Sequence, residues 1–140
     1  MVKFILGAKG SGKTKWLIDN ANKDMLEGNG NIAFVDVDDN HIFSLNYNVR
    51  LINAMEFNVL NVQSFYGFLC GIMAMDYDLE KIYVDGIYKV MHLELKDIVY
   101  LIDSLNKIAT KYEVEFYINI DYTMDTIPDN LKQYCYEIEI

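Results

Sequence analysis

The sequence predicts one α/β domain built on a mainly parallel sheet. Three observations predict it: the chain has 140 residues, 52% of them are apolar, and short apolar runs alternate with longer stretches at helical spacing. A chain of this length fits one compact domain with a sizeable core. Strands that alternate with helices are typical of parallel sheets. We therefore expect residues 1–140 to form a single domain.

Five apolar runs are expected to form strands. The first is apolar almost throughout, as a buried parallel strand is. The last alternates with polar residues, which suits the edge of a sheet. The expected strands are residues 2–6, 32–37, 81–85, 114–120 and 134–140. Residues 40–52 are ambiguous and fit either a short strand or a hairpin.

Three longer stretches are expected to form helices, and they cover residues 13–27, 64–75 and 95–112. The third is the clearest, because Leu95, Ile98 and Ile102 recur three to four positions apart. Gly28 follows the first stretch, as glycine often does at the end of a helix.

Composition argues against several functions. The net charge is −9 and Arg50 is the only arginine, so we do not expect a nucleic-acid partner, because such binding needs many cations. Cys70 and Cys135 have no second cysteine or histidine at metal-ligand spacing, which argues against a zinc ribbon. No stretch is long and apolar enough to span a bilayer, and no secretory pattern opens the chain, so we expect a cytoplasmic protein without a membrane span.

Residues 7–14 read GAKGSGKT and lie between an expected strand and an expected helix. Glycines permit the tight turn and let backbone N–H groups converge on an anion, toward which the positive end of the helix also points. Lys13 would supply a mobile cation to the β- and γ-phosphates, and Thr14 a hydroxyl to Mg²⁺. We expect Lys13 to face solvent without ligand. The expected nucleotide-binding residues are Gly7, Ala8, Lys9, Gly10, Ser11, Gly12, Lys13, Thr14 and Lys15.

This motif, in this setting, resembles the Walker A motif of the P-loop NTPase superfamily. The resemblance covers most of the chain by element order, but only GAKGSGKT is a specific match. It implies a three-layer α/β/α sandwich that binds a nucleoside triphosphate with Mg²⁺.

Residues 82–85 read IYVD, which is similar to a Walker B strand and implies that Asp85 holds Mg²⁺ opposite Thr14. The element order resembles the division that includes recombinase-like, helicase and secretion-motor ATPases, among them the pilus-retraction type. In that division a later strand lies between the phosphate-loop strand and the Walker B strand. The implied order of the five strands is fifth, first, fourth, third, second.

The ATPases of that division usually carry a glutamate directly after the Walker B aspartate, where it polarises the attacking water. This sequence has Gly86 at that position, which predicts slow hydrolysis. Glu94 and Asp121 are substitute candidates for the catalytic role, beside Lys13 and Asp85. Asn119, like Asp121, is also a candidate for sensing the γ-phosphate.

Asp36, Asp38 and Asp39 follow the second expected strand, at the end where open α/β sheets bind ligands. Contact with a nucleoside or a metal is one interpretation, and a solvated acidic turn is the favoured one. His41 and His92 are isolated in the sequence and do not suggest catalysis.

No Asn-Lys-x-Asp segment follows the fourth expected strand, so we expect ATP rather than GTP. The leading hypothesis is an ATP- and ADP-binding protein, a slow Mg²⁺-dependent ATPase that couples nucleotide state to shape or assembly. Self-association or a protein partner is left open. One alternative is a nucleoside-type kinase with an acceptor site from residues 38–60, and another is a non-hydrolysing regulator.

Overall fold

The computed structural model describes residues 1–138 and holds a six-stranded sheet flanked by three α-helices. The strands are β1 (Val2–Leu6), β2 (Asn31–Asp36), β3 (Arg50–Asn53), β4 (Leu79–Val84), β5 (Glu115–Asn119) and β6 (Cys135–Glu137). The helices are α1 (Lys13–Glu27), α2 (Val62–Met75) and α3 (Leu95–Tyr112). Four short 3-10 helices are η1 (Ala54–Phe57), η2 (Ile87–Lys89), η3 (Met124–Thr126) and η4 (Asp129–Tyr134).

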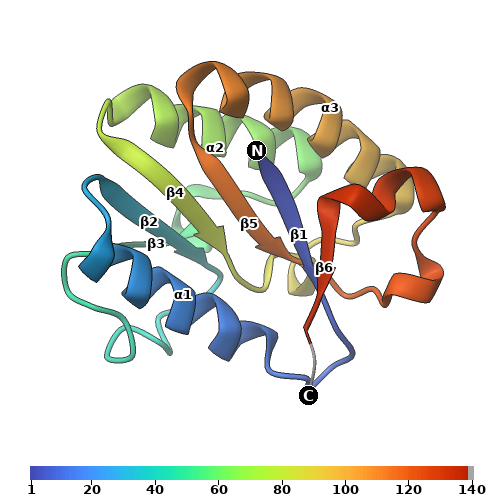
Figure 1. Cartoon of the computed structure of the whole chain (residues 1–140), viewed down its shortest axis with the longest axis horizontal. Coiled ribbons are helices and arrows are strands. Elements are labelled where there is room, and N and C mark those ends of the chain that lie inside the picture. Colours follow the sequence, from blue (N-terminus) through green and yellow to red (C-terminus); the bar gives the residue numbers. More distant parts are fainter. Residues whose placement is uncertain (139–140) are drawn as a thin grey trace.

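The sheet runs β3-β2-β4-β5-β1-β6, and each of its strand pairs within residues 1–138 is parallel (Figure 1). The expected number of five strands is wrong, because β3 adds a sixth beside β2, and the full order differs accordingly. The other five strands keep the relative order expected for them. Residues 139–140 of the last expected strand lie outside the described residues.

The helices cover both faces of the sheet. Side chains alternate along a strand, so Phe4 and Leu6 of β1 point to one face and Ile5 to the other. Phe4 and Leu6 share a core with the buried side chains of α2 and α3, whereas Ile5 packs with those of α1. Figure 1 shows α1 apart from α2 and α3, with the strands between them.

Helix bounds follow from local capping. Helices α1 and α3 have the expected bounds, and the N–H of Gly28 donates to the carbonyl of Asp24 at 2.8 Å where α1 ends. Helix α2 begins two residues earlier than expected, because Asn61 caps it: Asn61 Oδ1 accepts the N–H of Ser64 at 2.8 Å.

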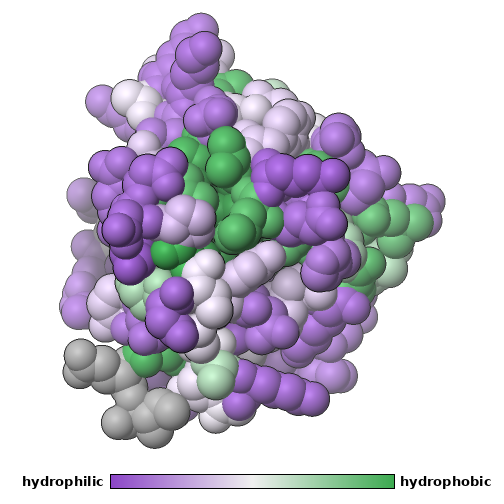
Figure 2. Space-filling model, turned by 90° about the vertical axis from the view of Figure 1, so that its right-hand side faces the viewer, coloured by the Kyte–Doolittle hydropathy of each residue, from purple (hydrophilic) through white to green (hydrophobic). Residues whose placement is uncertain are grey.

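The face of the molecule that carries β6 is mostly hydrophilic. Figure 2 shows this face, with an apolar area near its centre surrounded by hydrophilic residues. Over residues 1–138, none of the helices combines the length and the apolar character that crossing a membrane demands.

Candidate functional site

One edge of the sheet collects most of the predicted site residues. Neighbouring strands are parallel, so the carboxyl ends of β1, β4 and β5 meet there. The glycine-rich loop (residues 7–14) follows β1, Asp85 follows β4, and Asn119 ends β5. Open α/β sheets bind their ligands at this edge.

Asp85 is fixed at the centre of this edge. Its carboxylate oxygen Oδ1 accepts a hydrogen bond from Thr14 Oγ1 at 2.9 Å and another from Asn119 Nδ2 at 2.5 Å. The side chains of Asp85 and Asn119 are buried. Asn119 in turn accepts the N–H of Gly86 at 2.9 Å, so the residue after Asp85 is held by the same amide. The structure therefore brings together the two predicted magnesium ligands, Thr14 and Asp85.

Lys13 lies inside the site and not in solvent, so the expectation of a solvent-facing side chain is wrong. Only 4% of Lys13 is exposed. Its Nζ donates to the carbonyls of Gly7 at 2.7 Å and Ile120 at 3.3 Å, and it lies 3.9 Å from Asp121 Oδ1. A long side chain buries its stem where its ammonium finds such acceptors.

The surroundings of Lys13 also change the pKa of its ammonium group. Burial lowers the pKa of Lys13, and the negative charges of Asp121 and Asp85 partly offset this effect. The centroid of the Tyr88 ring lies 5.0 Å from Nζ, a cation–π contact that the sequence did not predict. Burial and the charge of Asp85 raise the pKa of Tyr88. The signal that could have placed Tyr88 here is its position three residues after Asp85.

The glycine-rich loop supplies donors suited to an anion. Gly12, with φ of 94°, precedes α1, and the first N–H groups of a helix have no acceptor inside it. Gly7 packs so closely against Ser11 that a Cβ at position 7 would overlap Ser11 Oγ. That hydroxyl is buried and has no hydrogen-bond partner within residues 1–138. Free N–H groups, a free hydroxyl and an ammonium match the needs of a phosphate group.

The outer residues of the loop are more exposed. Ala8, Lys9 and Gly10 lie at the surface. Lys15 is exposed on α1 and pairs with Asp19 at 2.5 Å, so its side chain is engaged along the helix. For Lys15, the backbone N–H and not the side chain is therefore the candidate for phosphate contact.

Asp36 departs from the favoured interpretation of a solvated acidic turn. Asp39 is exposed, whereas Asp36 is buried, with only 2% of its surface exposed. Asp36 accepts the N–H of Val37 at 2.8 Å, and its other carboxylate oxygen lies 3.1 Å from His41 Nδ1. Burial raises the pKa of Asp36, the hydrogen bonds from His41 and Val37 oppose this rise, and the charge of Asp85 adds to it. The sequence signal was an aspartate at the end of an otherwise apolar strand.

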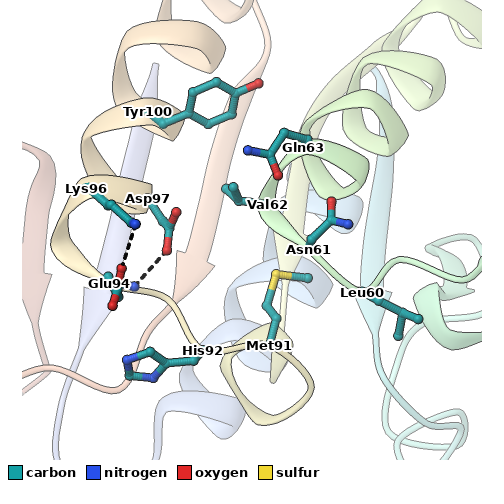
Figure 3. Close-up of a pocket in the computed structure, with 10 residues that line it drawn as sticks. All are labelled: Leu60, Asn61, Val62, Gln63, Met91, His92, Glu94, Lys96, Asp97 and Tyr100. Atoms are coloured by element: carbon teal, nitrogen blue, oxygen red, sulfur yellow. Dashed lines mark hydrogen bonds and ion pairs between the residues drawn. The ribbon is translucent and has the colours of Figure 1, made fainter.

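Glu94 lies at the start of α3, in a hollow of about 560 Å³ (Figure 3). Its carboxylate pairs with Lys96 at 3.1 Å, and its N–H donates to Asp97 at 2.9 Å. Figure 3 shows Lys96 and Asp97 of α3 on one side of the hollow and Gln63 of α2 on the other. The contacts of Glu94 are thus those of a helix start, and its catalytic role stays a prediction.

The residues at the carboxyl edge of the sheet combine an ammonium, two hydroxyls and backbone N–H donors with buried carboxylates. Such a set of groups can bind anionic oxygen atoms together with a hard cation that takes oxygen ligands. Comparison with protein-family models and with curated proteins finds no match for this chain.

Proposed function

We propose that this chain binds ATP with Mg²⁺ through its glycine-rich loop, as a P-loop NTPase with a three-layer α/β/α core does. The hydrogen bond between Thr14 and Asp85 is the observation that carries the proposal. It joins a hydroxyl from the start of α1 to a buried carboxylate after β4, the pair of oxygen ligands that Mg²⁺ takes in such sites.

Each part of the site has a role in this proposal. The backbone N–H groups of the loop and the hydroxyl of Ser11 would contact phosphate oxygens. Lys13 would exchange its two carbonyl acceptors, Gly7 and Ile120, for phosphate oxygens. Thr14 and Asp85 would hold Mg²⁺, which neutralises phosphate charge.

Slow turnover is part of the proposal. Gly86 has φ of 77°, a left-handed conformation that favours glycine, and its N–H is bound to Asn119. A glutamate that orients water does not fit that backbone without strain. Asp121 is a replacement candidate beside the loop, since it lies 3.9 Å from Lys13 Nζ and is largely exposed. We infer that ATP binding changes conformation or assembly, with hydrolysis slow or absent.

A second candidate function is phosphoryl transfer to a small acceptor. The hollow beside Glu94 supports it, since α2 and α3 follow β3 and β4 and begin at the same edge of the sheet as the glycine-rich loop. Its polar lining includes Asn61, Gln63 and Lys96, side chains that bind hydroxyl or carbonyl groups. The acceptor site would then lie in this hollow and include little of residues 38–60.

Calorimetry with ATP, ADP and GTP, with and without Mg²⁺, tests the proposal, followed by a phosphate-release assay on the same sample. We expect ATP to bind more tightly than GTP and Mg²⁺ to strengthen triphosphate binding. Absence of binding by any nucleotide would refute it. ADP formation that rises when a nucleoside is added, with an equal amount of phosphorylated nucleoside and no matching release of inorganic phosphate, would favour the kinase.

A further inference from the structure

Asp85 also belongs to a second group of side chains of the types that bind metals. The other two members lie on the side of Asp85 away from the glycine-rich loop. Asp36 ends β2, His41 lies in the turn that follows, and Asp85 follows β4. Strands β2 and β4 are parallel neighbours with Val35 opposite Val84, which places Asp36 and Asp85 side by side. One donor atom from each of the three residues lies within 4.8 Å of the other two.

The two carboxylates of this group are buried and close together. Asp36 is 2% exposed and Asp85 is 1% exposed. Two such charges destabilise each other unless a cation or a proton compensates them. Across residues 1–138, the only ion-pair partner of Asp36 is His41, which is charged only when protonated.

Asp85 keeps ligand capacity on this side. Both hydrogen bonds that its carboxylate accepts from residues 1–138 end on Oδ1, from Thr14 and Asn119. Its oxygen Oδ2 accepts none from that part of the chain. A carboxylate oxygen that accepts no hydrogen bond is a position that a cation can fill.

His41 decides which cation fits. Its side chain is 31% exposed, so an ion can reach the group from solvent and keep water in its open positions. One imidazole nitrogen with two carboxylate oxygens suits divalent ions such as Zn²⁺, Mn²⁺ or Co²⁺. Mg²⁺ prefers oxygen ligands alone and gives up its water reluctantly.

We propose that Asp36, His41 and Asp85 bind one divalent transition-metal ion. This site shares Asp85 with the proposed nucleotide site but does not depend on nucleotide. The ion compensates the two buried carboxylates, and its ligand bonds of about 2.0–2.2 Å draw the three side chains together.

Titration of the full chain with Co²⁺ alone tests this proposal, read by the visible absorption of the bound ion. We expect one equivalent to bind to the wild-type chain. His41→Gln and Asp36→Asn should each weaken binding at least about tenfold, the lower end of what disturbed metal sites lose. Asn at position 36 keeps an acceptor for the N–H of Val37, so this variant retains the local hydrogen bond.

His92→Gln is the matched control, because His92 is exposed and lies outside this group. It should bind Co²⁺ as the wild-type chain does. No binding by the wild-type chain, equal binding by His41→Gln, or an equal loss in His92→Gln would overturn the proposal. Circular dichroism identifies any variant that fails to fold. Either Asp36→Asn or His41→Gln is sufficient by itself to test the site.

A second pair of measurements distinguishes failure of the metal proposal from failure of the nucleotide proposal. Lys13→Met should lose ATP affinity and keep Co²⁺ binding, whereas His41→Gln should lose Co²⁺ binding and keep ATP affinity in Mg²⁺. Failure of Co²⁺ binding with ATP binding intact would refute the metal site alone. Failure of ATP binding with Co²⁺ binding intact would refute the nucleotide site alone.

Discussion

Thr14 and Asp85, 71 positions apart in the chain, are joined by a hydrogen bond of 2.9 Å between Oγ1 and Oδ1. The contact ties the first turn of α1 to the end of β4 at the carboxyl edge of the sheet. Asn119 binds the same oxygen of Asp85 from β5, so three elements fix one carboxylate. This arrangement holds Asp85 in place before any ligand arrives.

Asp85→Asn should weaken ATP binding in Mg²⁺ more than it weakens binding in EDTA. The carboxylate acts on the nucleotide through the metal, so its loss matters less once the metal is removed. Calorimetry under both conditions measures this. Asp103→Asn, at an exposed position on α3, is the control and should change neither affinity. Equal losses with and without metal would argue against a magnesium role for Asp85.

Gly86→Ala should destabilise the fold by about 1–2 kcal/mol, the approximate penalty for placing an L-residue in the left-handed region. The φ of Gly86 is 77°, and a Cβ there would lie 3.3 Å from Val37 Cγ2. Gly67→Ala is the matched control, since Gly67 lies in α2 with open space around it. That change should stabilise the protein by about 0.5–1 kcal/mol. Urea unfolding of both variants measures the difference, and the same sign in both would contradict this account of Gly86.

Elements with strong local signals were predictable from the sequence. The helical spacing of α3 and the glycine after α1 gave the observed bounds of both helices. Strand β3 was ambiguous, because its four residues Arg-Leu-Ile-Asn are half-buried or exposed at the sheet edge and carry no apolar run. It becomes a strand only by pairing with β2, a tertiary contact.

Long-range contacts also limited what could be predicted of the site. The motif placed Thr14 and Asp85 correctly at one edge, because parallel strands bring their carboxyl ends together. Lys13 was expected in solvent, since the carbonyl of Ile120 that binds it is 107 positions away. His41 looked isolated and Asp36 looked like part of a solvated acidic turn, because only folding buries the Asp36 carboxylate beside Asp85.

The stability of the wild-type chain relative to Lys13→Met should rise with pH as the solution approaches 10.5, the ordinary pKa of a lysine. Burial lowers the pKa of Lys13, so the unfolded chain binds more protons than the folded chain between the folded pKa and 10.5. In that pH range the folded chain loses the proton of Lys13, and with it a buried positive charge. Methionine keeps the apolar stem and carries no proton. Unfolding curves of both proteins over this alkaline range measure the difference, and a difference that falls as pH rises would contradict the prediction.

Unstimulated ATP hydrolysis should be slower than about 1 s⁻¹, the low end for kinases with every catalytic part in place. Gly86 offers no side chain to orient water, a contribution worth about 10²–10⁴-fold. Phosphate release at several protein concentrations measures the rate. A rate per molecule that rises with concentration would show that self-association completes the site. Faster turnover by a monomer would show that another residue acts as the base, and Asp121→Asn and Glu94→Gln would then tell which.

The most direct test of the central claim is calorimetric titration of ATP with Mg²⁺ into the wild-type chain and into Lys13→Met. Methionine fills the volume left by a side chain that is 4% exposed, so the variant separates charge from packing. We predict that Lys13→Met keeps its fold and binds ATP at least about tenfold more weakly, because a hydrogen bond to a charged group contributes about 1.5–3 kcal/mol. Lys23→Met, at an exposed position on α1, should bind ATP as the wild-type chain does. Equal ATP affinity in folded Lys13→Met and in the wild-type chain would contradict the claim that the glycine-rich loop binds the triphosphate.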